Sequence, residues 1–228
     1  MNTSPGYNDI VIDAVGSTGF HDNNGGSWTH VVGTGKERIL IVSIGSRSYT
    51  PTGITYNSIA LTKAYNSPNY DSCRGSIWYL MNPPTGSHSV AVTFAASARW
   101  IGGSVSAFNV ESRPTEIPYY RTAYDTGNAS SCSTTINNSI GGCLGVDAMF
   151  NTGQDSNFGL GAYQTLIVKG DDTDAGGVSY GSNLPLGNVS FSWNNFETDS
   201  TASSQAVVMF LPSIKRSNLL GIFFGLMT

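Results

Sequence analysis

Charged side chains are scarce in this sequence. Asp, Glu, Lys and Arg make up 11% of its 228 residues, against roughly 25% in an average globular domain. Ser, Thr, Asn and Gly carry most of the polarity, a composition typical of extracellular or virion β-proteins. The net charge is −4, and Lys215 and Arg216 form the one adjacent basic pair. The chain therefore lacks the basic stripe that a nucleic-acid-binding domain presents.

Long apolar runs are missing as well. No segment approaches the roughly 18 residues that a membrane-spanning helix needs. Residues 1–16 lack the basic start and the apolar stretch of a secretory signal. Because the sequence starts at Met1, we expect an intact gene product without an export signal.

Cysteine is rare, and the spacing of the cysteines does not indicate disulfide pairs. The three residues are Cys73, Cys132 and Cys143, an odd number without the spacing of a disulfide framework or a zinc site. Cys132 and Cys143 would be placed to bond if they lay on adjacent strands. The favoured interpretation is that all three are buried free thiols, because free cysteine packs as a small apolar residue.

What the sequence does contain is the period of β-strands. Residues 76–94, SIWYLMNPPTGSHSVAVTF, read as two strands joined by a Pro/Gly turn, which predicts a hairpin. Residues 38–44 are apolar on both faces and predict a central strand covered on both sides. Residues 54–61 predict a tight hairpin that turns at Asn57 and Ser58. About a dozen such strands and no amphipathic helix predict an all-β, antiparallel sandwich.

Several blocks, in their order, are similar to a known family. They are SWTHVVGTGKERILIVSIG, GITYNSIALTKA, SIWYLMNPPTGSHSVAVTF and IGGSVSAFNVE. Together they resemble a β-sandwich domain of bacterial surface and secreted proteins and of phage structural proteins, over residues 9–212. Asn57 and Ser58 stand where the family has a glycine pair. The resemblance implies a jelly-roll-like fold and a module of a cell or particle surface, and it brings no catalytic residues.

The sequence offers no recognisable catalytic constellation. The three histidines are His21, His30 and His88. None of them lies near a Gly-x-Ser-x-Gly nucleophile elbow in the sequence, and none forms a zinc-binding His-Glu-x-x-His motif. His30 shares a strand face with Trp28, which indicates a hydrogen-bonded core histidine. We therefore expect a protein that is not an enzyme and that needs no cofactor.

Two groups of residues are candidates for binding a ligand. Tyr119, Tyr120 and Tyr124 would suit a carbohydrate platform or a protein interface, in which tyrosine is enriched. The acidic cluster Asp171, Asp172 and Asp174 would suit calcium. Such a cluster also commonly terminates a strand, and the sequence leaves both alternatives open.

The end of the chain stands apart from the strand pattern. We divide the chain into a sandwich domain, residues 1–212, and a tail, residues 213–228. The predicted assembly residues of the tail are Leu219, Leu220, Ile222, Phe223, Phe224 and Leu226. Exposed apolar residues of this kind mark an interaction site, and docking within the chain or on a neighbouring copy both remain open.

These observations predict a non-enzymatic virion protein of a phage-like particle. It would be a capsid decoration or cement protein, a spike or a tail component, and it would form homo-oligomers or bind other virion proteins. The alternative is a carbohydrate-binding or adhesion module on a bacterial cell surface, with a surface glycan as its partner.

Overall fold

The computed structural model of the chain describes residues 6–111, 120–125, 131–153, 158–171, 173–194, 196 and 202–215, with the backbone alone for 120–125. The regular elements of these residues are all strands, and none is a helix able to cross a bilayer. The strands are β1 (Val11–Val32), β2 (Ile39–Arg47), β3 (Gly53–Tyr56), β4 (Ile59–Ala60), β5 (Thr62–Asn66), β6 (Cys73–Met81), β7 (Gly86–Phe108), β8 (Tyr120–Asp125), β9 (Ser131–Asn138), β10 (Cys143–Asn151), β11 (Gly159–Leu160), β12 (Thr165–Asp171), β13 (Ala175–Leu184), β14 (Gly187–Asn194) and β15 (Ser203–Phe210). The predicted all-β sandwich is confirmed.

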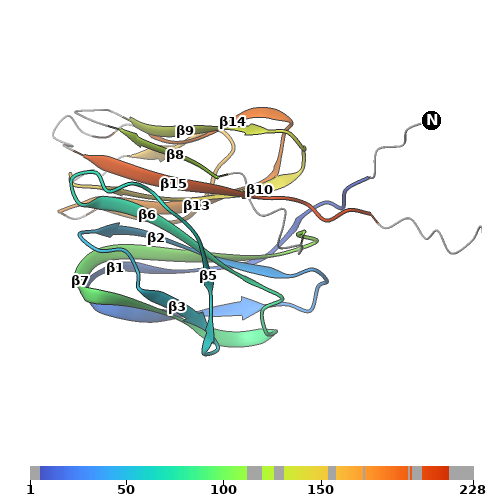
Figure 1. Cartoon of the computed structure of the whole chain (residues 1–228), viewed down its shortest axis with the longest axis horizontal. Coiled ribbons are helices and arrows are strands. Elements are labelled where there is room, and N and C mark those ends of the chain that lie inside the picture. Colours follow the sequence, from blue (N-terminus) through green and yellow to red (C-terminus); the bar gives the residue numbers. More distant parts are fainter. Residues whose placement is uncertain are drawn as a thin grey trace, which may run out of the picture.

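The strands form three antiparallel sheets stacked on one another (Figure 1). The N-terminal sheet has the order β4-β3-β7-β2-β6-β5, with β1 paired to β7. The middle sheet has the order β12-β13-β10-β15-β8, and the outer sheet has the order β11-β14-β9. The first half of the chain therefore builds one sheet, and the second half builds the other two.

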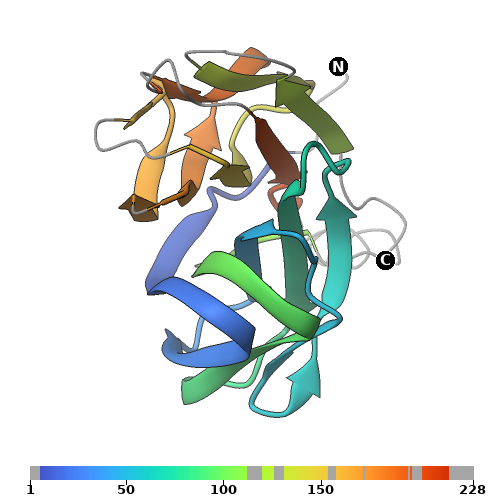
Figure 2. The same cartoon turned by 90° about the vertical axis from the view of Figure 1, so that its left-hand side faces the viewer.

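The N-terminal sheet curls back on itself because β1 and β7 are long and bent (Figure 2). β7 pairs with β3 along residues 90–93 and with β2 along residues 99–107, while β1 follows it along both parts. Register shifts in β1 lie between Thr18 and His21 and between Asn23 and Gly25. Such bulges bend a strand pair, so the two halves of the sheet face each other across an inner core.

The inner core fills this curled sheet with large side chains. It comprises Trp28, Val32, Leu40, Val42, Ile44, Ile54, Tyr56, Leu61, Trp78, Val90, Val92, Phe94, Ala98 and Trp100. On β2 the even-numbered residues face this core, and Ile39 and Ile41 face the middle sheet. The prediction of a central strand covered on both sides is therefore confirmed for residues 38–44.

Two further cores lie between the layers. Val105 and Ala107 of the N-terminal sheet pack against Val146 and Val208 of the middle sheet. On the other side of the middle sheet, a second apolar set packs against the outer sheet, with Met209 close to Phe191 in one cluster. β10 and β15 are buried along their whole length, as expected for strands that are covered on both faces.

One predicted pairing is wrong. Residues 76–94 do contain two strands joined by a turn, but β6 and β7 do not pair with each other, because β2 lies between them. The apolar β2 buries most when it lies at the centre, so the turn spans it. The hairpin at residues 54–61 is confirmed: β3 pairs with β4, and Asn57 and Ser58 have φ values of 48° and 64°. Two consecutive positive φ values are the signature of a type I′ turn.

Candidate functional site

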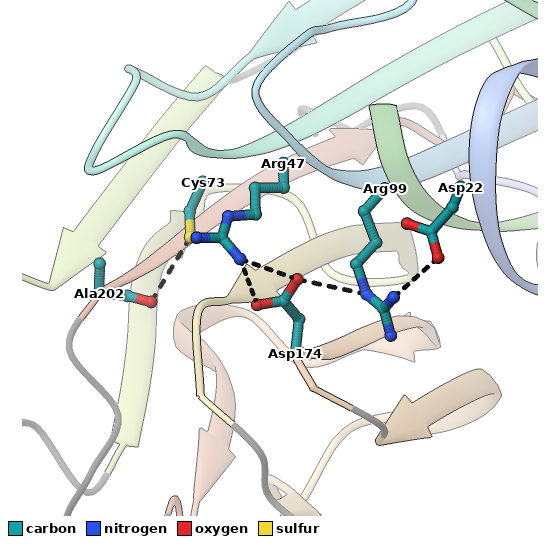
Figure 3. Close-up of polar contacts among 6 residues, drawn as sticks. All are labelled: Asp22, Arg47, Cys73, Arg99, Asp174 and Ala202. Atoms are coloured by element: carbon teal, nitrogen blue, oxygen red, sulfur yellow. Dashed lines mark hydrogen bonds and ion pairs between the residues drawn. The ribbon is translucent and has the colours of Figure 1, made fainter. Parts of the chain in front are cut away.

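The most concentrated group of charges lies where the N-terminal sheet meets the middle sheet (Figure 3). Arg47 ends β2, Asp22 and Arg99 lie at the bend of β1 and β7, and Asp174 lies in the turn between β12 and β13. Arg47 Nη1 donates to Asp174 Oδ1 at 3.0 Å and to Oδ2 at 3.3 Å. Arg99 Nε lies 3.2 Å from Asp174 Oδ2, and Arg99 Nη1 lies 2.8 Å from Asp22 Oδ2.

Burial divides this cluster into an inner and an outer part. The Asp174 side chain is 1% exposed and Arg99 is 13% exposed, whereas Asp22 is 65% exposed. The Arg99 guanidinium also lies over the Phe20 ring, 4.9 Å from its centroid. A buried carboxylate is tolerated when cations and hydrogen bonds surround it. The cluster therefore ties strands of two sheets together around Asp174.

This geometry bears on the predicted calcium site. Both oxygens of Asp174 are engaged by guanidinium groups, which leaves its carboxylate committed to arginine. Asp171 is exposed at the end of β12, and Asp172 lies outside the described residues. Within the described part of the chain, no three His, Cys, Asp or Glu side chains are grouped closely enough to hold a metal ion.

The three cysteines are buried thiols that form no disulfide, as predicted. Cys73 Sγ donates to the Ala202 carbonyl at 3.5 Å (Figure 3). Burial, with a smaller contribution from the charge of Asp174, raises the pKa of Cys73 to about 12. Burial likewise raises the pKa of Cys143 to about 12. Because the thiolate is the reactive species, these thiols are chemically quiet near neutral pH.

His30 and Ser104 form a hydrogen-bonded pair inside the N-terminal sheet. Ser104 Oγ lies 2.8 Å from His30 Nδ1, and it accepts from Trp28 Nε1 at 2.9 Å. Burial lowers the pKa of His30 to about 4, against the opposing charge of Asp13. Both members of the pair are 1% exposed. The prediction of a hydrogen-bonded core histidine is confirmed.

Sequence reasoning missed a third polar cluster, centred on Asp147 between the middle and outer sheets. Asp147 is fully buried on β10. Its carboxylate accepts from Trp193 Nε1 at 2.5 Å, from Gln205 Nε2 at 2.7 Å and from Gln164 Nε2 at 3.4 Å. It also accepts from the backbone N–H of Ser179 at 3.1 Å and from the Ser179 hydroxyl.

These donors only partly offset the burial of Asp147. Burial raises the pKa of Asp147 to about 6, although the bonds from Ser179, Gln205 and Trp193 oppose the rise. The donors that hold the carboxylate are all neutral. One signal was available in the sequence, since Asp147 is the one charged residue in the otherwise apolar run CLGVDAMF. An acid placed inside a doubly covered strand has to find partners within the protein.

The remaining predicted residues lie on β8 or outside the described residues. Tyr120 and Tyr124 belong to β8, at the edge of the middle sheet, where their backbones pair with Val208 and Ser204. Tyr119 and the six assembly residues of the tail lie outside the described residues. The tyrosine platform and the docking of the tail therefore both stay predictions.

Comparison of the chain with protein-family models, with curated proteins and with solved structures gives no significant match. The resemblance to the surface and phage domain family therefore stays a prediction that rests on its sequence motifs. The ion-pair cluster and the Asp147 cluster share one property: each ties strands of different sheets. Their geometry favours a role in holding the layers in register.

Proposed function

We propose that this protein is a non-enzymatic structural component of a phage-like particle. It assembles with copies of itself or with other virion proteins through the apolar tail, and its place is that of a decoration protein, spike or tail component. The observation that carries the proposal is the anchoring of the first tail residues, 213–215, to residues 6–8.

The last described residues are anchored to the start of the chain. The backbone N–H of Asn8 donates to the Ser213 carbonyl at 2.8 Å, and that of Lys215 donates to the Gly6 carbonyl at 2.7 Å. Tyr7 and Ile214 form an isolated bridge between the same segments. The described part of the chain thus ends at a fixed point beside one end of the stack (Figure 1). The apolar sequence of the tail follows directly after this anchored point.

The sheet edges favour the tail as the main assembly element. β1 carries three register shifts, and β5 and β12 carry one each, together with Lys63 and Lys169. Bulges and lysines are devices that hinder edge-to-edge pairing. β9 is regular and uncharged, but it lies beside β8 of the middle sheet. Each long edge strand among the described residues therefore either carries bulges that hinder pairing with another chain or lies beside a strand of the next sheet.

The chemistry of the tail supports association. Full burial of one Leu, Ile or Phe side chain contributes about 1.5–3 kcal/mol, and residues 219–226 contain six of them. A neighbouring copy or another particle protein is the partner that the proposal assigns to this segment.

The test compares the full chain with a chain that stops at Lys215. Sedimentation velocity over a range of protein concentrations gives the oligomeric state of each. The proposal expects association of the full chain and loss of it on truncation. A matched control replaces Phe223 and Phe224 by leucine, which keeps the tail apolar and keeps association. A full chain that stays monomeric at high concentration, or a truncated chain that associates equally well, would overturn the proposal.

A second candidate function is binding of a neutral glycan, and the outer sheet favours it. The outward residues of β9 and β14 are uncharged and lie in cross-strand pairs, such as Thr135 with Ser190, whose hydroxyl oxygens are 2.7 Å apart. The full set is Ser131, Ser133, Thr135, Asn137, Asn188, Ser190, Ser192 and Asn194. Glycan-array binding that is lost on Thr135→Ala and Ser190→Ala together would establish this face. Loss on replacing Tyr119 or Tyr120 would instead place the site at the predicted tyrosines.

A further inference from the structure

The curled N-terminal sheet holds buried polar atoms that have no hydrogen-bond partner in the described structure. Four of them, which we call the polar quartet, are Ser46 Oγ, Asn66 Oδ1, Ser76 Oγ and Trp78 Nε1. Ser46 and Ser76 are fully buried, and Trp78 is 7% exposed. Buried polar groups in folded proteins are nearly always satisfied by protein, water or ligand. We therefore expect the four atoms of the quartet to hydrogen-bond to a bound molecule.

The strand alternation places the four side chains on the same face. On β6, Leu80 and Trp78 belong to the inner core, so Ser76, two residues before Trp78, also faces inward. On β2, Ile44 belongs to the inner core, and Ser46 follows it at the same spacing. Asn66 of β5 is the direct cross-strand partner of Ser76.

The register places members of the quartet beside one another, and none of the four atoms hydrogen-bonds another. Directly opposed side chains in a sheet have Cβ atoms about 4.5–5.5 Å apart, and diagonal neighbours lie roughly 7–8 Å apart. Asn66 and Ser76 are opposed, whereas Ser46 pairs with Arg74 and is therefore diagonal to Ser76. One oxygen atom between two partners spans roughly 5–6 Å, because each bond is about 2.8 Å long.

The quartet has a defined chemical preference. The Trp78 indole only donates, the Asn66 side-chain oxygen only accepts, and the two serine hydroxyls do both. None of the four is charged, and burying a charge without a counter-charge is costly. We propose that the polar quartet is a binding site for a small neutral molecule that carries hydroxyl groups, of which water is the smallest member.

Arg74 closes the edge of this site. It lies on the same face of β6 as Ser76 and is half-buried. Its Nη1 donates to the Ser48 carbonyl and, at 3.4 Å, to the Ser72 carbonyl. Arg74 thereby holds the segment that follows β2 against the start of β6.

The first test measures the urea midpoint of unfolding for Ser76→Ala. If a bound hydroxyl compound hydrogen-bonds Ser76, the variant loses a satisfied bond and its midpoint falls. If the hydroxyl is unsatisfied, alanine removes a buried penalty and the midpoint rises or stays, which would overturn the proposal. Ser106→Ala is the matched control, because Ser106 is also fully buried and its hydroxyl donates to Asp13 at 2.8 Å. We expect the two variants to lose stability to a similar extent.

The second test identifies the ligand by crystallography of the full chain. One crystal form is grown without polyol, and a second is soaked in glycerol. A single peak within hydrogen-bond distance of at least two quartet atoms in both crystals identifies water. Extended density after the soak identifies a polyol site. Crystals without density bridging the quartet would refute the inference.

Discussion

Asp147 and His30 make the stability of this protein depend on pH in opposite directions. The pKa of Asp147 is raised from 3.8 to about 6, mainly by burial. The folded state therefore holds this proton more tightly than the unfolded state does. Its contribution favours folding below about pH 4 and is lost as the pH rises through 6. At 1.36 kcal/mol per pKa unit, the change amounts to about 3 kcal/mol.

His30 works the other way. Burial lowers its pKa from 6.5 to about 4, so the folded state holds its proton more weakly than the unfolded state does. The contribution of His30 is fully present above about pH 6.5 and is lost as the pH falls towards 4. The magnitude is again about 3 kcal/mol. Between about pH 4 and 6.5, the stability that Asp147 loses as the pH rises is therefore nearly offset by the stability that His30 gains.

Two variants separate these contributions. Asp147→Asn leaves His30 alone, and we expect its free energy of unfolding, relative to wild type at the same pH, to fall by about 3 kcal/mol between pH 6.5 and 4. His30→Gln leaves Asp147 alone, and we expect the relative free energy to rise by a similar amount over the same interval. Urea unfolding at constant ionic strength, followed by tryptophan fluorescence, measures both.

Differences from wild type remove the contribution of the carboxylates that all three proteins share. The absolute stability of Asp147→Asn is not the test, because an amide cannot accept all the bonds that the carboxylate accepts. The test is the slope with pH. Profiles of the two variants that run parallel to wild type between pH 4 and 6.5 would refute this reasoning, since neither group would then bind its proton differently in the folded state.

Two further predictions concern the ion-pair cluster and the thiols. Asp174→Asn leaves two guanidinium groups around a buried amide, so we expect a loss of about 3 kcal/mol in urea unfolding at pH 7. The matched control Asp22→Asn removes an exposed partner of Arg99 and should cost about 0.2–1 kcal/mol; equal losses would contradict the central role of Asp174. We also expect Cys73, Cys132 and Cys143 to resist a thiol reagent in the folded protein and to react together in urea, because all three are fully buried. Rapid labelling of any of them without denaturant would count against the described burial.

The sequence carried enough information for the strands but not for their neighbours. Residues 38–44 are apolar on both faces, and that pattern alone predicts a central strand. The partner of β6 could not be predicted in the same way, because a Pro/Gly turn signals only that the chain reverses, and the reversal here crosses β2. The segment at residues 21–26 has the composition of a loop, yet it lies within the bend of β1. Local turn residues serve loops and bulges equally well.

The polar clusters show a sharper limit. In the sequence Asp174 belongs to an acidic cluster, and one of the two arginines that pair with it, Arg47, stands 127 positions earlier in the chain. Only the stacking of two sheets brings them together. Asp147 was readable in principle, because an acid in an apolar strand needs buried donors, but its donors come from four separate segments. That the cysteines remain thiols was predictable from their number and spacing alone.

The scarcity of charge and the position of these clusters follow from one requirement. Apolar side chains between stacked sheets attract one another without direction, so burial alone sets no register between layers. Directional bonds do set it. The Asp147 carboxylate needs donors from the middle and outer sheets at once, and Asp174 needs two arginines of the N-terminal sheet. If one sheet shifted over the next by the distance between two strands, a buried carboxylate would lose its hydrogen-bond donors. The free-energy cost of that unpaired charge exceeds what new apolar packing would contribute. In this protein a few buried polar side chains therefore specify the stack that many apolar ones stabilise.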